Sequence, residues 1–400
     1  MKQTFDKQGW KRIKFGEVCR NLNIAERDPL SNGIDRFVGL EHIEPENLHL
    51  KSWGNIADGI TFSKRFKPGQ VLFGKRRSYQ KKVAFAEFDG ICSSDILVLE
   101  ANEKRIEPSL FPFLLQSERF LEHAVNTSAG ALSPRTKFQD LAQFEFLLPP
   151  KEQQAKIAEL LWAADNATQK AISLVNGLGE LLKLSSDLIF ETYTKKPTIN
   201  NVRNLDGYQE CPVTDLLSTK LLNGIYKSKE YLGHGIKLVN MGELFAYPKL
   251  YNPDMQRITL SDKEEKQFLL QKGDLLFARR SLVIEGAGKC SIVMTDEEKM
   301  TFESSIIRLR LNTKLILPMY CHYFFRSSEG VKRIKRIVGY TTVAGITGSD
   351  LYNISVPVIE KKEQEKCVEN LGRIEELITE AKNHVTKTEN VIKNLIHKVF

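Results

Sequence analysis

Residues 144–161, FEFLLPPKEQQAKIAELL, resemble residues 353–371, NISVPVIEKKEQEKCVENL, about 210 positions further along the chain. Each stretch combines a β-like run that ends at a proline, a Glu-Gln pair and the start of a long amphipathic helix. The matching residues are Pro149 with Glu152-Gln153, and Pro357 with Glu363-Gln364.

The similarity extends upstream in the same order. The further matches are Pro68–Arg77 with Lys272–Arg280, Ser93–Asn102 with Glu303–Asn312, and Asp140-Leu141 with Asp350-Leu351. Matches that keep their order over half a chain indicate a duplicated unit, here a globular head followed by a helix. Two similar but non-identical heads on a spacer suit recognition of a target in two parts.

Length and composition predict a globular protein with more than one domain. The chain has 400 residues, of which 42% are apolar and 27% charged, and one hydrophobic core rarely supports that length. No apolar run reaches the roughly 20 residues that span a bilayer, so no membrane contact is expected. The N-terminus, MKQTFDKQGWKRIKFGE, is charged where a secretion signal would be apolar, and a cytoplasmic protein is expected.

The cysteines and the net charge narrow the function classes further. Six cysteines lie far apart without a Cys-x-x-Cys pair, and the seven histidines are scattered too. This spacing argues against a zinc site and a disulfide framework, and fits a reducing cytosol. The net charge of +8 favours an anionic partner such as nucleic acid.

Two α/β heads of similar size are predicted, head 1 at residues 10–148 and head 2 at residues 208–357. Short β-type runs dominate both, and short helices are expected near 108–125 and 318–337. The clearest runs are Arg36–Leu40, Val71–Phe73, Val83–Phe85 and Ile96–Leu99 in head 1, and Ile236–Val239, Asp274–Phe277, Ser291–Met294 and Ile306–Leu311 in head 2.

A long helix is predicted after each head, with apolar residues at alternating spacings of four and three that predict a coiled-coil seam. The seam residues are Ile157, Leu161, Ala164, Ala171, Val175, Leu178, Leu182 and Ile189 in the first helix, and Leu371, Ile374, Ile378, Ala381, Val385, Ile392 and Leu395 in the second. A flanking stripe repeats every seven residues at Leu160, Ala167, Leu174, Leu181 and Leu188. Each helix would be about 50 Å long.

Three questions about the helices stay open from the sequence. Each apolar stripe could instead pack on its own head. Gly177 and Gly179 could mark a bend or a close crossing. Residues 197–207, rich in polar residues and broken by Pro and Gly, are expected to form the linker to head 2.

Local catalytic signatures are absent or incomplete. Glu285–Cys290 resembles a phosphate-binding loop but lacks its first glycine and its hydroxyl residue, so a glycine turn between strands is favoured. Asp254, Glu264 and Lys266 resemble a metal-dependent nuclease site, but Glu264 lies where a helix capped by Ser261 should start. The Asn/Asp-Pro-Pro-aromatic loop of a DNA amino-methyltransferase is also missing. We therefore expect no catalytic residue and no metal site in this chain.

Basic segments supply the candidate DNA contacts. Residues 64–82 hold eight Lys or Arg and no acid, and such clusters pair with phosphates or with guanine. The corresponding turn of head 2, the basic run 326–337 and the small, hydroxyl-rich loops 127–137 and 339–348 complete the set. The predicted DNA-binding residues are Lys75, Arg76, Arg77, Tyr79, Lys81, Lys82, Arg135, Lys137, Arg279, Arg280, Lys332, Arg333, Lys335, Arg336, Tyr340, Thr341 and Thr342.

Taken together, these motifs resemble the specificity (S) subunit of type I restriction-modification systems. The resemblance runs from Trp10-Lys-Arg-Ile to the C-terminus and rests on the two heads, on the turn Gly69–Phe73 repeated at Gly273–Phe277, and on the proline and Glu-Gln pair before each helix. The second copy departs from the first because it reads Pro357-Val-Ile-Glu where the first has Pro149-Pro150.

The resemblance implies a division of the chain and a set of partners. It implies target recognition domains at 1–149 and 197–358, and antiparallel spacer helices at 150–196 and 359–400. It further implies binding to double-stranded DNA, to two methyltransferase (M) subunits and, through them, to restriction (R) subunits. S-adenosylmethionine, ATP and Mg²⁺ would bind the partner subunits, and this chain would hold no cofactor.

Two other functions remain as alternatives. A coiled-coil scaffold without sequence-specific DNA binding would explain the helices, with an incidental basic surface. A single-chain nuclease would use Asp254, Glu264 and Lys266 with Mg²⁺.

Overall fold

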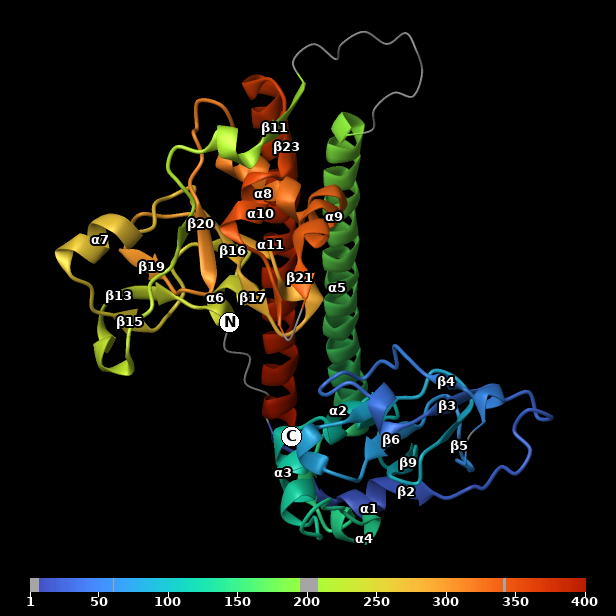
Figure 1. Ribbon diagram of the computed structural model, residues 1–400. Helices are drawn as coiled ribbons and strands as arrows, with labels where there is room; N and C mark the ends of the chain where they lie inside the picture. Colours follow the sequence, from blue (N-terminus) through green and yellow to red (C-terminus); the bar gives the residue numbers. More distant parts are fainter. Residues whose placement is uncertain (1–6, 60, 195–207, 341–342) are drawn as a thin grey trace. The chain divides into compact units, whose positions relative to one another are not determined.

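The structure is a computed structural model that describes residues 7–59, 61–194, 208–340 and 343–400 (Figure 1). The chain divides into two compact units, the first formed by Met1–Ser173 with Ala381–Phe400 and the second by Leu174–Glu380. Two long helices, α5 (Lys151–Thr194) and α11 (Lys361–Val399), each contribute one end to each unit. The predicted linker at 197–207 lies outside the described residues.

Head 1 consists of short strands and helices. The strands are β1 (Lys11–Lys14), β2 (Cys19–Leu22), β3 (Arg36–Val38), β4 (Gly54–Asn55), β5 (Lys64–Phe66), β6 (Val71–Gly74), β7 (Val83–Phe85), β8 (Gly90–Cys92), β9 (Ile96–Ala101) and β10 (Glu145–Leu148). The helices are α1 (Phe15–Val18), α2 (Phe111–Leu115), α3 (Glu118–Asn126) and α4 (Phe138–Leu141).

The main sheet of head 1 is antiparallel, with the strand order β2-β9-β6-β7. Its central strand β6 is buried at every position, because the apolar run Val71-Leu72-Phe73 faces core on both sides of the sheet. A second sheet has the order β4-β3-β8-β5, in which β3 and β8 run parallel.

Head 2 repeats this set of elements. Its strands are β11 (Gln209–Pro212), β12 (Leu222–Asn223), β13 (Leu232–Val239), β14 (Lys249–Leu250), β15 (Arg257–Ile258), β16 (Leu275–Ala278), β17 (Arg280–Ser281), β18 (Cys290–Val293), β19 (Met300–Phe302), β20 (Ile306–Leu309), β21 (Gly339–Tyr340), β22 (Ala344–Gly345) and β23 (Ser355–Val358). Its helices are α6 (Met241–Ala246), α7 (Asp262–Phe268), α8 (Pro318–Arg326), α9 (Ser328–Ile337) and α10 (Gly348–Tyr352).

The sheet topology confirms the duplication. The order β12-β20-β16-β18 in head 2 matches β2-β9-β6-β7 in head 1, with β14 added beside β18. The order β15-β13-β19 matches β4-β3-β8, including the parallel pair. Every β-type run and both short helical regions that the sequence predicts are present, so the two α/β heads are confirmed.

Each long helix starts at a buried glutamine. The Gln154 Nε2 donates to the Pro149 carbonyl at 2.7 Å and its Oε1 accepts the Glu107 N–H at 2.7 Å. The Gln364 Nε2 donates to the Ile359 carbonyl at 2.8 Å and its Oε1 accepts the Leu317 N–H at 2.8 Å. The match of Gln153 with Gln364 was therefore wrong by one residue, since Gln154 is the equivalent of Gln364.

The seam of the two helices is buried or half-buried at every predicted position in the described chain, including Ile157 and Leu371. In the first unit, Leu161 of α5 shares a core with Ile396 of α11 and with head 1. In the second unit, Phe190 of α5 shares a core with Leu371 of α11 and with head 2. The start of one helix thus meets the end of the other, so the pairing is antiparallel, and each stripe packs on a head as well.

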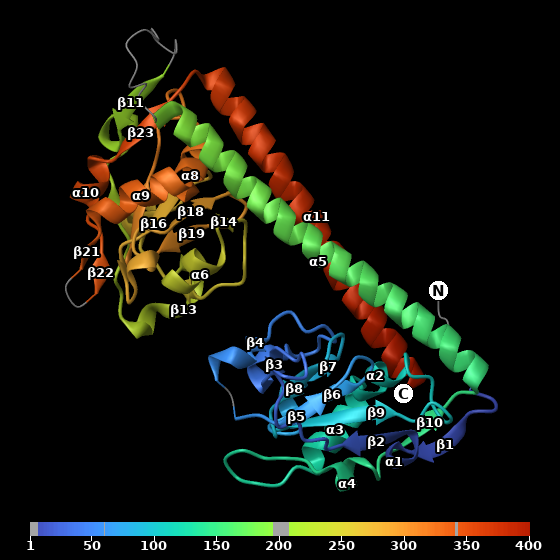
Figure 2. The same cartoon turned by 90° about the vertical axis from the view of Figure 1, so that its right-hand side faces the viewer.

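Two further observations concern the helices. A Cβ on Gly177 or Gly179 would meet no atom within 4 Å, so these glycines do not mark a close crossing, and α5 continues through them (Figure 2).

Within the described residues, no helix has the length and apolar character needed to cross a membrane.

Candidate nucleic-acid interface

The basic turn of head 1 connects β6 to β7 and lies at the end of the buried central strand. Arg76 lies opposite Arg135 in an isolated β-bridge, which joins this turn to the loop 127–137. The Lys75 N–H donates to the Asp95 carbonyl at 2.9 Å, and the Lys75 carbonyl accepts the Thr136 N–H at 3.0 Å. Two loops that the sequence predicts separately as DNA contacts are therefore held together.

Asp95 is the centre of this arrangement. Its Oδ1 accepts from the Arg135 Nε at 2.9 Å, and its Oδ2 lies 3.4 Å from an Arg76 guanidinium nitrogen. Burial alone would raise the pKa of Asp95, but the hydrogen bond from Arg135 and the charges of both arginines outweigh burial and lower it. Asp95 therefore stays ionised and fixes the directions of two cations. The sequence did not indicate this role, although Asp95 lies in the segment 93–102, which has a counterpart at 303–312.

Tyr79 projects from a strained part of the same turn. Ser78–Gln80 form a short 3-10 helix whose flanking residues, Arg77 and Lys81, have φ of 54° and 52°. Residues other than glycine seldom adopt this left-handed conformation, and such strain concentrates at functional sites. Tyr79 is 55% exposed, so the turn presents an aromatic residue to solvent close in sequence to Arg76 and Arg77.

The other predicted DNA contacts of head 1 differ in how far their side chains are exposed and free of internal partners. The Lys81 Nζ pairs with Glu46 at 2.9 Å, and the Lys82 Nζ donates to the Leu40 carbonyl at 2.6 Å. Lys137 is exposed just before α4. Tyr79, Arg135 and Lys137 are therefore the exposed members of the predicted set in head 1, whereas Arg76, Lys81 and Lys82 are half-buried and bonded within the head.

The equivalent turn of head 2 follows β16. Arg279 is half-buried and donates to the Ser304 carbonyl at 3.4 Å. Arg280 starts β17, pairs with Gly345 of β22 and exposes its side chain. No ion pair joins Arg280 to another residue in the described part of the chain, so its charge is available to an external anion.

The basic residues of helix α9 fall into an exposed group and one internally paired arginine. Lys332, Lys335 and Arg336 are exposed. Arg333 instead contacts Glu329 at 3.0 Å and Glu210 at 2.7 Å, and lies 5.3 Å from the Phe324 ring centre. Its guanidinium secures α9 to the head, so we leave Arg333 out of the proposed DNA contacts. Thr341, Thr342 and the Tyr340 side chain lie outside the described residues.

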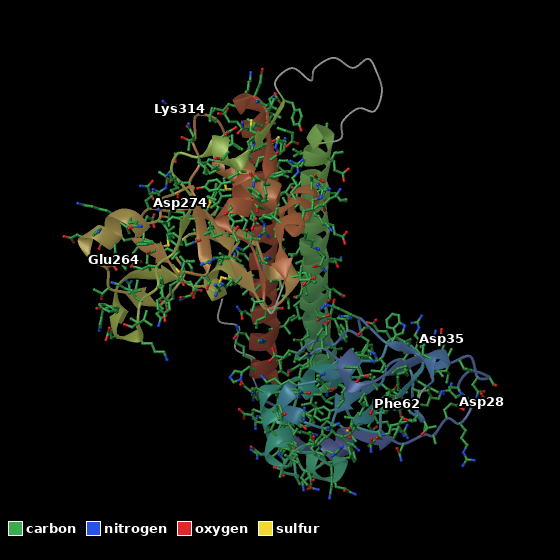
Figure 3. All side chains as sticks on the ribbon, viewed as in Figure 1. Asp28, Asp35, Phe62, Glu264, Asp274 and Lys314 are labelled. Carbon is green, nitrogen blue, oxygen red and sulfur yellow. The ribbon has the colours of Figure 1, made fainter. Side chains whose placement is uncertain are left out.

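Residues that resembled a nuclease site and a phosphate-binding loop have structural roles. The Glu264 Oε2 accepts from Ser261 and from the Lys227 Nζ, each at 2.8 Å, and Lys227 with Ser261 lowers the pKa of Glu264 to about 2. Ser261 is thus the N-cap of α7, as expected, and Glu264 completes its capping box (Figure 3). Gly286 and Gly288 are buried in a turn between β17 and β18, as predicted. Among the described residues, no three His, Cys, Asp or Glu side chains are grouped to hold a metal ion.

Comparison with known proteins gives a family match over most of the chain. The family model of the type I restriction modification DNA specificity domain matches residues 8–175 and again residues 225–388. The chain therefore belongs to this family and contains the domain twice.

Individual relatives are more distant. The EcoDI specificity subunit of Escherichia coli is 28% identical over 46% of this chain, and the match spans only 41% of that protein. The putative MjaX specificity subunit of Methanocaldococcus jannaschii is 21% identical over 98% of this chain and 97% of its own. The type I restriction-modification S subunit of M. genitalium has a similar fold, with a TM-score of 0.59 over 100% of this chain and 97% of its own, at 12% identity.

Proposed function

We propose that this chain is the DNA sequence-recognition subunit of a type I restriction-modification complex and that each head binds one half of a split target. One observation carries the proposal: both copies of the family domain end their central buried strand in a basic turn. These are the turns after β6 and β16, with Arg76-Arg77 and Arg279-Arg280. Cations on a fixed scaffold position a protein on the phosphate backbone, while neighbouring side chains contact base edges.

The different surroundings of the two turns support two different half-sites. In head 1, Arg76 and Arg135 are bound to Asp95, and Tyr79 follows Arg76-Arg77 in the same turn. In head 2, Arg280 is unpaired among the described residues and is followed by apolar Leu282 and Val283. Since base recognition depends on the donor, acceptor and apolar groups presented, the two heads should recognise different sequences.

Partner binding forms a second part of the proposal. In the second unit, α5 exposes Leu174, Leu181, Leu184 and Leu188, with exposed fractions of 55, 48, 66 and 70%. The first, second and fourth follow each other at seven-residue spacing on one face of a helix, as in a coiled-coil seam without its partner. This stripe supports docking of M subunits, with R subunits joining through them.

The proposal assigns no catalytic step to this chain. S-adenosylmethionine, ATP and Mg²⁺ would bind the partner subunits, where methyl transfer and DNA cleavage would take place. In this chain, Glu264 belongs to the capping box of α7, and residues 286–288 form a buried turn.

A footprint of the chain purified with its M subunits tests the proposal. We expect two protected patches separated by a constant gap, about one helical turn of DNA or a multiple apart. Arg279→Ala with Arg280→Ala should weaken protection and reduce its dependence on salt. A stable complex that protects no preferred sequence would favour the scaffold alternative.

A further inference from the structure

The turn between β17 and β18 exposes three consecutive apolar side chains. Leu282, Val283 and Ile284 are 86%, 57% and 44% exposed. Single exposed apolar residues are ordinary on protein surfaces, but adjacent ones mark a contact surface. We refer to these three residues as the apolar tip.

The base of the turn is firmly packed, so the exposure of the tip is built into the fold. Gly286, Ala287 and Gly288 are buried. Gly288 has φ +75°, and a Cβ at this position would lie 2.3 Å from Ile334 of α9. The Gly288 N–H donates to the Ala278 carbonyl at 2.8 Å, and the Val283 N–H donates to the Ser281 Oγ at 3.2 Å. Only glycine fits at position 288, which explains the turn that resembles a phosphate-binding loop.

The surroundings of the tip are basic. Arg280 lies two residues before it, and Lys335 of α9 lines an open hollow of about 560 Å³ together with Val283, Ile284 and Val331. Glu285, which directly follows the tip, is acidic and exposed. A carboxylate is repelled by phosphate but accepts hydrogen bonds from the amino groups of bases. The tip is therefore suited to base edges, while the flanking cations are suited to the phosphates.

We propose that the apolar tip, chiefly Leu282, contacts a thymine 5-methyl group in the major groove and so specifies an A·T pair in the half-site of head 2. This methyl group is the one apolar feature that base edges present in that groove. The inference rests on the proposed function. It names the chemistry that the turn would recognise.

The equivalent turn of head 1 supports this role by comparison. There, the 3-10 helix Ser78–Gln80 occupies the place that Ile284–Gly286 occupies in head 2, and it exposes Tyr79. Both turns thus present an apolar or aromatic side chain beside arginines, but with different shapes. A single aromatic ring and a triplet of aliphatic residues should select different bases.

The test uses the chain in complex with its M subunits and duplexes that carry the mapped site. Each thymine of the head 2 half-site is replaced in turn by deoxyuridine, which removes only the methyl group. We expect one or two replacements to weaken binding of the wild-type complex about three- to tenfold. The Leu282→Ala complex should bind the thymine duplex more weakly than the wild-type complex does, by a similar factor. Replacing the thymine by deoxyuridine should not weaken its binding further.

Leu315→Ala is the matched control, since Leu315 is 46% exposed in the same head but lies outside this turn. It should retain the full response to deoxyuridine. The inference would be overturned if binding is specific but no deoxyuridine replacement weakens it, or if the half-site contains no thymine. Either result would leave the proposed function intact. Loss of all sequence preference in the wild-type complex would instead reject the proposed function. If Leu282→Ala releases the M subunits, the tip is a protein contact and the inference is wrong.

Discussion

Asp95 is the central carboxylate of the proposed DNA interface in head 1. It holds Arg76 and Arg135 from two different loops, so under the proposal this surface would be organised before DNA binds. The same carboxylate reduces the net positive charge of the turn. Asp95 should therefore favour binding to the specific sequence and weaken binding to other DNA.

We expect Asp95→Ala to lower the ratio of specific to non-specific affinity by about tenfold. Non-specific binding should become tighter and more dependent on salt, because removal of the carboxylate adds one net positive charge to the turn. Titration of both kinds of duplex at several salt concentrations measures this. Asp89→Ala is the control, since Asp89 pairs with Arg65 at 2.8 Å away from the turn; equal ratios for both variants would contradict the role of Asp95.

Two arginines of head 2 provide a second contrast. Arg280→Ala should weaken DNA binding and reduce the slope of log affinity against log salt by about one, with no loss of stability. Arg333→Ala should leave that slope unchanged but lower the free energy of unfolding by about 3 kcal/mol, because Glu210 and Glu329 lose their shared partner. Salt titrations and denaturant unfolding of both variants separate the two roles, and identical behaviour would contradict the assignment.

At the scale of elements, the buried glutamines Gln154 and Gln364 join each head to its helix. Gln154→Ala would leave the Glu107 N–H and the Pro149 carbonyl without their partner. We expect a loss of about 2–4 kcal/mol in the free energy of unfolding of the first unit. Gln153→Ala, at the neighbouring position, removes only the hydrogen bond that its Oε1 accepts from the Trp10 indole N–H at 3.0 Å, and should cost about 1 kcal/mol. Denaturant unfolding compares them, and a larger effect at Gln153 would contradict the structural equivalence.

His49 joins head 1 to α5 through hydrogen bonds to two carboxylates. Its Nε2 lies 2.6 Å from Asp165 of α5 and its Nδ1 lies 2.9 Å from Glu87. The hydrogen bond to Asp165 raises the pKa of His49 above 6.5, and burial opposes this less strongly. A raised pKa in the folded state stabilises the unit below pH 6.5, and this stabilisation is lost as the pH rises through the raised value.

We therefore expect the thermal stability of the first unit to fall as the pH rises through this range, and His49→Gln to remove that fall. Melting curves at a series of pH values measure the effect. We expect His49→Gln to be less stable than the wild type at low pH. At high pH the two proteins should be equally stable. Parallel curves at all pH values would show that His49 does not titrate at this junction.

The elements were predictable from the sequence to different degrees. The strands, the paired short helices and the long helices follow from hydrophobic periodicity and from the repeat itself. The pairing of His49 with Asp165 could not be predicted, because 116 residues separate them. The internal role of Arg333 was missed for the same reason, since its partner Glu210 lies 123 residues away. The basic composition of 326–337 was visible, but its division into exposed and internal cations depends on the packing of α9.

At the scale of the whole molecule, the duplication is the main structural fact. The two copies of the family domain share the strand order β2-β9-β6-β7 and β12-β20-β16-β18, and each has a buried glutamine at the start of its helix. The two copies differ in the side chains that their basic turns expose. This combination of a shared framework and different turns is what recognition of a split, asymmetric sequence requires.

The most direct test of this account is to map methylated adenines in the DNA of cells that express the chain with its M subunits. A single motif made of two different half-sites and a constant gap is the expected result. Replacing residues 208–357 with the same region of another specificity subunit should change one half-site and leave the other intact. A stable complex that methylates no defined motif, or an exchange that alters both halves, would contradict recognition by two separate heads.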